Sequence, residues 1–159
     1  MNAPDPAIAS AAPPASLMSA ADYRDSLRAY RPRVYLNGQQ VDCVADEPLL
    51  RPGIDALGVT YDMAKDAKLS ALMLSNGAGH TLPRMLDLNR SAGDLLNKLE
   101  AVRLMCQETG CAQRYLAHDG LNAVAQVAAR IDDAQGSTEH RARFAAYLQT
   151  VQQRDLSLG

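Results

Sequence analysis

Three side chains that can bind a metal lie close together in the sequence: Cys106, Cys111 and His118. If residues 111–118 are helical, Cys111, Tyr115 and His118 share one face, because residues three and four apart are neighbours on a helix. A metal or iron–sulfur site draws three or four ligands, and Cys-x4-Cys matches no strong zinc or cluster spacing. Spacing alone therefore favours buried, inert cysteines over a metal site.

Two further polar sets have both a functional and an ordinary interpretation. Arg114, Asp119 and Asn122 lie in a segment rich in Ala, Leu and Val, and a ligand cavity explains them as well as a solvated face. Arg24, Arg28 and Arg31 have helical spacing, which suits phosphate or carboxylate binding. Neighbouring aspartates partly neutralise this stripe, so a solvated face is favoured.

No catalytic constellation follows from order along the chain. The three histidines fall in three different segments, and the glycines of residues 76–79 lack the strand, lysine and helix start of a phosphate-binding loop. Residue types alone establish no catalysis.

The elements that must position these side chains are mostly helices. Apolar residues recur at three and four residues, Ser19 and Ser91 each precede a capping-box aspartate, and Gly110 and Gly136 suit helix ends. Asn37-Gly38 predicts a type I′ hairpin turn, whereas residues 75–80 form a turn-rich connection that is exposed or functional. We expect helices over 20–30, 53–66, 91–109, 111–131 and 138–151 and one β-hairpin over 34–41, giving a mainly α fold.

The composition bounds the class of protein. The 159 residues, with 47% hydrophobic side chains, suit one domain. A net charge of -2 and only 4% aromatic residues argue against nucleic-acid binding. Residues 1–18 are expected to be a flexible Ala/Pro-rich tail, and residues 19–159 the folded domain.

Cysteine usage and hydropathy bear on location. Three cysteines without dense, even spacing suit a reducing compartment. The first residues lack the features of a signal peptide, and the apolar stretch at residues 69–74 is too short to span a bilayer. We expect a soluble, cytoplasmic protein with no membrane contact.

Four stretches carry a resemblance to a flavoenzyme family. They are RVYLNG from Arg33, Arg51-Pro, Thr60-Tyr-Asp and DGLNA from Asp119. The chain from about Met18 to Gly159 resembles the amino-terminal region of the family that contains 4-hydroxyphenylacetate 3-monooxygenase and 4-hydroxybutyryl-CoA dehydratase.

The resemblance implies a fold related to acyl-CoA dehydrogenases, of which this chain holds the helical amino-terminal domain. It implies FAD, held mostly by segments absent from this chain, and a small-molecule substrate. The expected partners are the remaining flavin-binding domains or a separate subunit, in a homo-oligomer that is a tetramer by family. The chain is then expected to be a fragment, a separately encoded subunit or a truncated gene product.

The resemblance also implies candidate site residues. By position in the family, Gln113, Arg114, Tyr115 and His118 line the pocket between this domain and the flavin. In the dehydratase branch Cys111 matches the first cysteine of a [4Fe–4S] cluster. Tyr115 stands where the second cysteine is expected, and a phenol is no ordinary substitute for a thiolate.

The monooxygenase branch is also incomplete at its substrate-binding positions. There an Arg and a Tyr bind the phenolic substrate, and Leu116 and Gly120 occupy the matching positions here.

Three hypotheses about function follow from this resemblance. The first is the substrate-side domain of a reduced-FAD-dependent monooxygenase, the second a dehydratase-like acyl-CoA enzyme with FAD and an iron–sulfur cluster, and the third a non-catalytic assembly subunit.

Overall fold

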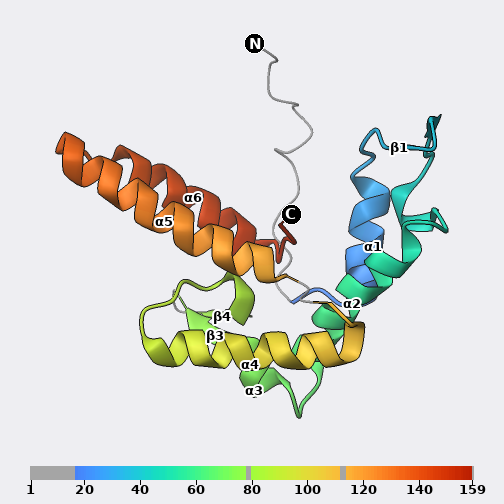
Figure 1. Ribbon diagram of the computed structural model, residues 1–159, viewed down its shortest axis with the longest axis horizontal. Coiled ribbons are helices and arrows are strands. Elements are labelled where there is room, and N and C mark those ends of the chain that lie inside the picture. The colour runs from blue at the N-terminus through green and yellow to red at the C-terminus, as the bar shows by residue number, and fades with distance from the viewer. Residues whose placement is uncertain (1–16, 78–79, 112–113, 159) are drawn as a thin grey trace.

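The computed structural model describes residues 17–77, 80–111 and 114–158 (Figure 1). The described part is mainly helical, as expected, with two small hairpins rather than one. The helices are α1 (Ala20–Ala29), α2 (Arg51–Lys65), α3 (Ser70–Met73), α4 (Ala92–Thr109), α5 (Tyr115–Gln135) and α6 (Glu139–Gln153). The strands are β1 (Tyr35–Leu36), β2 (Gln39–Gln40), β3 (Leu74–Gly77) and β4 (His80–Pro83), and the 3₁₀ turns are η2 (Val44–Asp46) and η3 (Arg84–Leu86).

Both predicted capping boxes are present. The Ser19 hydroxyl accepts a hydrogen bond from the Asp22 amide at the start of α1, and Ser91 and Asp94 repeat the arrangement at α4. α4 ends at Gly110, whose φ of 71° is left-handed. Local chemistry therefore sets these three helix ends, because each cap satisfies main-chain groups that the helix leaves unpaired.

The first hairpin also follows its turn sequence. Asn37 and Gly38 have φ angles of 50° and 81°, the positive values that a type I′ turn requires. The antiparallel register pairs Tyr35 with Gln40 and Leu36 with Gln39. This confirms the predicted hairpin.

The expected turn-rich connection over residues 75–80 is wrong for residues 75–77 and for His80, which belong to strands β3 and β4. β3 and β4 pair antiparallel, with Leu74 opposite Pro83 and Ser75 opposite Leu82. Leu82 is 1% exposed and belongs to an apolar cluster with residues of α5 and α6. Local propensity does not predict this short hairpin, because its strands are stabilised by burial against other elements.

The predicted start of the helix at residue 111 is also wrong. α5 begins at Tyr115, because Arg114 has a left-handed φ of 59° that interrupts the helical path. Its other end is later than expected, at Gln135, before Gly136 with φ 61°. Cys111 therefore precedes α5, and the shared helical face of Cys111, Tyr115 and His118 does not form.

α1 crosses α2 at a glycine. A Cβ on Gly58 would lie 3.0 Å from the Ala20 Cβ, so the close approach requires a small residue. The Ala20 amide donates to the Asp62 carboxylate at 2.9 Å. Beside this crossing, the arginine stripe is a solvated face with ion pairs, as favoured: Arg24 pairs with Asp55, Arg28 with Asp25 and Asp46, and Arg31 is exposed.

Two apolar clusters hold the described helices together. One joins α2, α3 and α4 through residues such as Met63, Met73 and Met105, and the other joins β4, α5 and α6. Neighbouring residues of η3 enter different clusters, since Met85 lies in the first and Leu86 in the second. η3 is thus the junction of the two cores.

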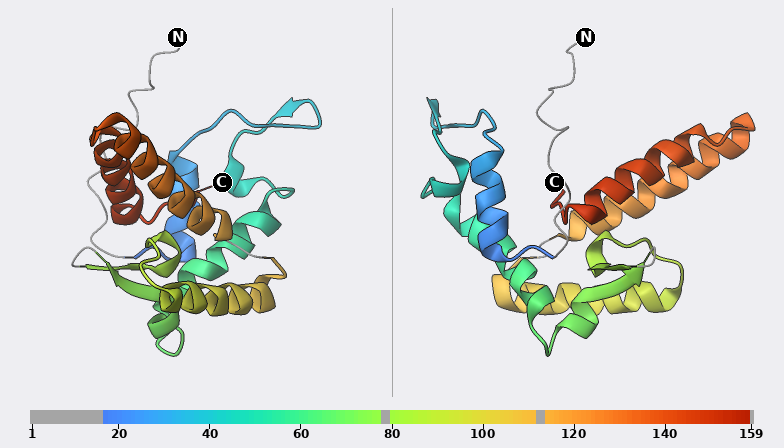
Figure 2. Two further views of the ribbon diagram at one scale, coloured as in Figure 1. Left: turned by 60° about the vertical axis from the view of Figure 1, so that its left-hand side comes forward. Right: turned by 180° about the vertical axis from the view of Figure 1, so that it is seen from behind.

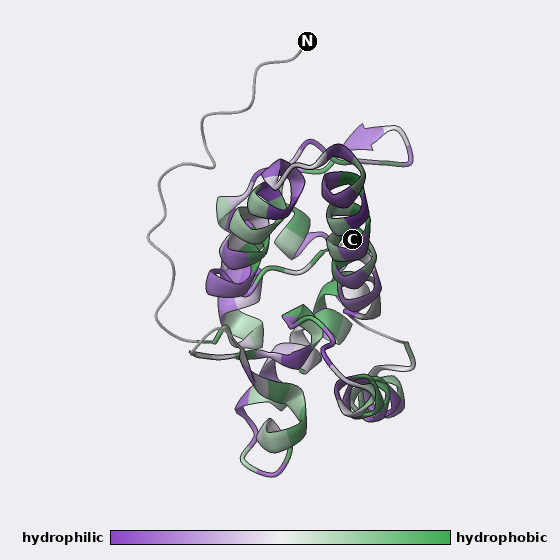
Figure 3. Ribbon diagram, turned by 90° about the vertical axis from the view of Figure 1, so that its left-hand side faces the viewer, coloured by the Kyte–Doolittle hydropathy of each residue, from purple (hydrophilic) through white to green (hydrophobic). Residues whose placement is uncertain are grey.

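The helix pairs stand on a common base. α1–α2 and α5–α6 rise from the same side of the layer formed by α4 and the β3–β4 hairpin, and they diverge toward opposite ends of α4 (Figure 2). Hydrophobic and hydrophilic residues both occur along these helices (Figure 3), and within the described ranges none of them is long and apolar enough to cross a membrane. Of the expected tail 1–18, only Leu17 and Met18 are described.

A buried carboxylate closes the α5–α6 hairpin. Asp132 is 0% exposed and accepts hydrogen bonds from the main-chain amides of His140 and Arg141, at 3.1 and 2.9 Å. The His140 Nδ1 lies 2.9 Å from the same carboxylate. This single side chain satisfies two amides of the first turn of α6, and the Ser137 hydroxyl accepts from a third, that of Glu139.

We predict that Asp132→Ala lowers the melting temperature by roughly 5–10 °C, because two half-buried amides lose their acceptor. Thermal unfolding followed by circular dichroism measures the effect. Asp133→Ala is the matched control, since Asp133 is exposed and makes an ion pair with Arg141. Equal losses in both variants would contradict the assigned role of Asp132.

Candidate functional site

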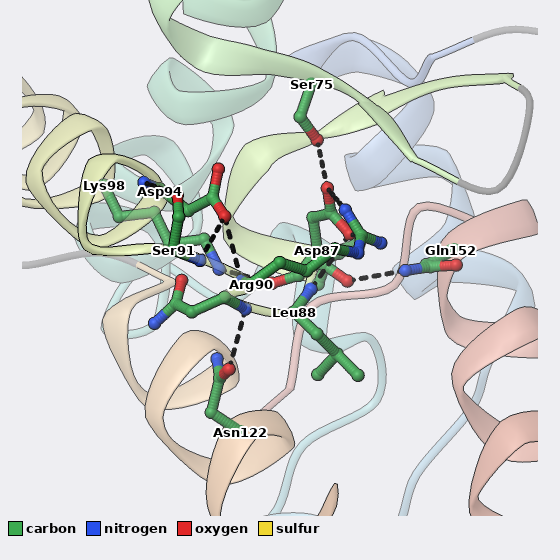
Figure 4. Close-up of polar contacts among 11 residues, drawn as sticks. Ser75, Asp87, Leu88, Arg90, Ser91, Asp94, Lys98, Asn122 and Gln152 are labelled. Carbon is green, nitrogen blue, oxygen red and sulfur yellow. Dashed lines mark hydrogen bonds and ion pairs between the residues drawn. The ribbon is translucent and has the colours of Figure 1, made fainter.

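A polar cluster forms around the buried Asp87 carboxylate, in the chain between η3 and α4 (Figure 4). The Asp87 carboxylate, 8% exposed, accepts from the Ser75 hydroxyl at 3.0 Å and from the Arg90 guanidinium at 2.9 Å. It also accepts from the Leu88 amide at 2.9 Å. Gln152 of α6 donates to the Leu86 carbonyl at 2.8 Å. The segment is therefore tied to β3 and α6 by side chains.

Lys98 of α4 lies beneath the same segment. It is 2% exposed, and its ammonium donates to the Asp87 carbonyl. Burial lowers the pKa of Lys98 to about 8, although the carboxylates of Asp87 and Asp94 act against this shift. The cluster thus contains an amine that loses its proton more easily than an exposed lysine.

His118 of α5 faces the segment from the other side. It is 4% exposed, and its Nε2 lies 3.1 Å from the Asn89 Nδ2. The Asn89 amide donates to the Asn122 Oδ1 at 2.9 Å, and the Asn122 Nδ2 donates to the His118 carbonyl at 2.8 Å. Burial, and then the charge of Lys98, lower the pKa of His118.

Arg114 anchors the start of α5 inside the domain. Its guanidinium donates to the Asp155 carboxylate at 2.7 Å, with the side chains 3% and 5% exposed. It lies 4.4 Å over the Tyr61 ring, which stacks on Tyr23. Burial raises the pKa of Asp155, and Arg114 opposes that effect.

The Arg114–Asp155 pair also contacts residues from distant parts of the chain, including Met18 near the start of the described residues. The Tyr61 hydroxyl donates to the Asp155 carbonyl at 3.0 Å, and the Met18 amide donates to its carboxylate at 3.2 Å. Arg114 and Asp155 both have left-handed backbones, with φ 59° and 47°. Such angles are costly for residues other than glycine, so the surrounding contacts must hold them.

An apolar groove runs between α5, α6 and the chain after α6. Its volume is about 200 Å³. Gly120 opens one wall, since a Cβ placed there would meet nothing within 4 Å. The lining residues are Ala117, Gly120, Leu121, Val124, Phe144, Tyr147 and Leu158.

The structure brings only some of the predicted site residues together. Arg114 and His118 are buried on α5 and its N-cap, whereas Gln113 and the side chain of Tyr115 lie outside what is described. Asp119 is exposed, and Asn122 hydrogen-bonds within the His118 cluster. The arginine and asparagine thus contact the protein interior.

The cysteines are dispersed. Cys111 is exposed, and Cys43 and Cys106 are half-buried and free. Among the described residues no group of three or more His, Cys, Asp or Glu is arranged to hold a metal ion. An iron–sulfur cluster needs several thiolates or comparable ligands, so the described donors do not fit one, and Cys111 alone would have to be completed from elsewhere.

Sequence reasoning missed Asn89 and Lys98. Lys98 lies three residues before Ala101 and seven before Met105, both 0% exposed. This spacing places Lys98 on the buried face of α4. The same spacing, read from the sequence, could have identified Lys98 as a buried residue. No comparable pattern marks Asn89, which becomes important through its contact with α5.

These features define the helical amino-terminal domain of an acyl-CoA dehydrogenase-like fold. Residues 19–159 match the family model described as "4-hydroxyphenylacetate 3-hydroxylase N terminal". The chain belongs to this family.

Similar proteins come from both branches. A 4-hydroxybutyryl-CoA dehydratase/vinylacetyl-CoA-Δ-isomerase of Clostridium aminobutyricum is 37% identical over 143 residues, which are 88% of this chain and 29% of the relative. An oxygen-tolerant archaeal 4-hydroxybutyryl-CoA dehydratase from N. maritimus superposes with a TM-score of 0.82 at 34% identity, over 89% of this chain and 28% of that one.

The other branch agrees in fold. The oxygenase component of 4-hydroxyphenylacetate 3-monooxygenase gives a TM-score of 0.71 at 19% identity, over 88% of this chain and 29% of that one. The chain therefore spans less than a third of the length of these relatives.

We predict that Arg114→Met destabilises the domain by about 3–5 kcal/mol, because it leaves the Asp155 carboxylate buried without its partner. Adding Asp155→Asn should recover part of that loss, which urea unfolding of both variants measures. Arg143→Met is the control: this exposed arginine pairs with Glu139, and its change should stay within about 0.5 kcal/mol. A double variant no more stable than Arg114→Met would refute the coupling.

Lys98 gives a pH-dependent prediction. Its lowered pKa means that the unfolded chain binds more protons between about pH 8 and the ordinary lysine pKa, so wild-type stability gains with pH in that window. Relative to Lys98→Met, the wild type should gain up to about 2 kcal/mol between pH 7 and 9.5. Denaturant unfolding at both pH values tests this, with the exposed Lys68→Met as control. A pH-independent difference would contradict it.

Proposed function

We propose that this chain is the amino-terminal, substrate-side domain of a flavin-dependent oxidoreductase, and that its reaction is a reduced-FAD-dependent hydroxylation. The observation that carries the domain assignment is the family match over residues 19–159. The preference for hydroxylation rests on Tyr115, which occupies a position where the dehydratase branch is expected to supply a cluster cysteine.

The proposed FAD would be held mostly by segments other than this chain, and when bound it would supply the activation of oxygen. The apolar groove beside Gly120 would suit as one wall of a site for a ring or a hydrocarbon chain. Arg114 fixes the first turn of α5 through Asp155. Gln113, Tyr115 and His118 are the proposed substrate contacts, with Arg114 positioning them.

A second candidate is a dehydratase-like acyl-CoA enzyme. Identities of 37% and 34% to two 4-hydroxybutyryl-CoA dehydratases, against 19% to the oxygenase component, favour it. It would need a [4Fe–4S] cluster to which this chain contributes Cys111. The proposal further includes a small-molecule substrate, a homo-oligomer, a partner or further segment with the flavin-binding residues, and a cytoplasmic location.

A chimera tests the assignment. The 143 matched residues of the Clostridium aminobutyricum dehydratase are replaced by the matching residues of this chain, and the purified protein is assayed for FAD absorbance, iron and acid-labile sulfide. We expect stoichiometric FAD with little iron, because Tyr115 offers a phenol where a thiolate is needed. Tyr115→Cys should raise iron and sulfide several-fold, and Tyr30→Cys is the control, because Tyr30 is 67% exposed and lies outside the groove.

The outcomes separate the hypotheses. A folded chimera without FAD would refute the domain assignment and favour a non-catalytic assembly role. Stoichiometric iron with Tyr115 in place would refute the preference for hydroxylation and support the dehydratase. FAD together with oxygen consumption by the reduced chimera would support hydroxylation.

A further inference from the structure

Asn89, His118 and Asn122 form a closed ring of hydrogen bonds between α5 and the segment that precedes α4. The Asn89 side chain meets the His118 Nε2 at 3.1 Å, while its main-chain amide meets the Asn122 Oδ1 at 2.9 Å. Asn122 closes the ring on the His118 carbonyl at 2.8 Å. Asn89 therefore contacts the imidazole of His118, and Asn122 holds its main-chain carbonyl.

The chemistry of the Asn89 contact fixes the role of Nε2. The atom that faces the imidazole is the Asn89 Nδ2, an NH₂ group that only donates. In this orientation of the amide Nε2 accepts, and the single proton of a neutral imidazole then lies on Nδ1. A protonated ring would set two donors against each other at this contact.

The surrounding charges favour the same state. Lys98 of α4 places a cation near the ring, and Asp119 of α5 opposes it with the weaker effect. Asp87 and Arg90 lie in the Asn89 segment and pair with each other, and Asp94 caps α4. With His118 4% exposed, burial adds to the cost of a second proton.

We propose that Asn89 is a positioning residue that holds His118 as the neutral Nδ1–H tautomer, so that His118 acts as a hydrogen-bond donor and not as a general base. Any group that meets Nδ1 must then be an acceptor. This inference goes beyond the proposed function, because it concerns the protonation state of a side chain inside the domain and holds whatever the substrate is.

The tautomer is measurable in the full chain without flavin or substrate. Two-bond ¹H–¹⁵N correlation spectra distinguish the two neutral tautomers and the imidazolium, and His118→Gln assigns the signals. We expect the Nδ1–H pattern at pH 7, persisting below the ordinary histidine pKa of 6.5. In Asn89→Asp a carboxylate replaces the donor, so Nε2 should gain a proton and the titration midpoint should rise by roughly one unit or more.

Asn97→Asp is the matched control, because it makes the same substitution at an exposed position of α4; it should leave the His118 pattern unchanged. An Nε2–H tautomer or an imidazolium at pH 7 in the wild type would overturn the proposal, even if Asn89→Asp failed to fold. So would an Asn89→Asp spectrum identical to the wild type. The result is independent of FAD content in the chimera, so failure here and failure of the proposed function are distinguishable.

Discussion

The main-chain polar groups of the segment 84–91 impose the constraint on which this domain depends. The segment passes between two apolar clusters, where an unpaired carbonyl or amide is costly. Lys98, Gln152 and Asn122 each satisfy one such group, from three different helices. These three contacts fix α4, α5 and α6 relative to one another, although the helices do not share a single core. His118 lies against the same segment.

Arg114 and Asp155 act as the second organising contact. Their ion pair joins the start of α5 to the chain after α6, over 41 residues of sequence, and Tyr61 brings in α2. Both residues keep left-handed backbones, so the pair determines where α5 begins. Because Tyr115 and His118, two of the proposed substrate contacts, lie in the first turn of α5, a contact that stabilises the fold also positions part of the candidate site.

Features of the fold could be predicted from the sequence where the residues that determine them are close together along the chain. The capping boxes at Ser19 and Ser91 and the Asn37-Gly38 turn were predicted correctly, since each involves residues at most three apart. The start of α5 and the β3–β4 hairpin were not, because Arg114 is held by a distant carboxylate and Leu82 by the α5–α6 cluster. Cys111 was consequently expected on a helix that it only precedes.

The sequence by itself determined the family, the mainly helical class and most helix boundaries, because these follow from residue type and short-range periodicity. Only the tertiary structure decided the environments of Lys98, Asn89 and His118. An amine, an amide and an imidazole acquire their protonation and donor roles from burial and from partners on other elements. Those partners lie 11 and 29 residues away along the chain, beyond the reach of any local pattern.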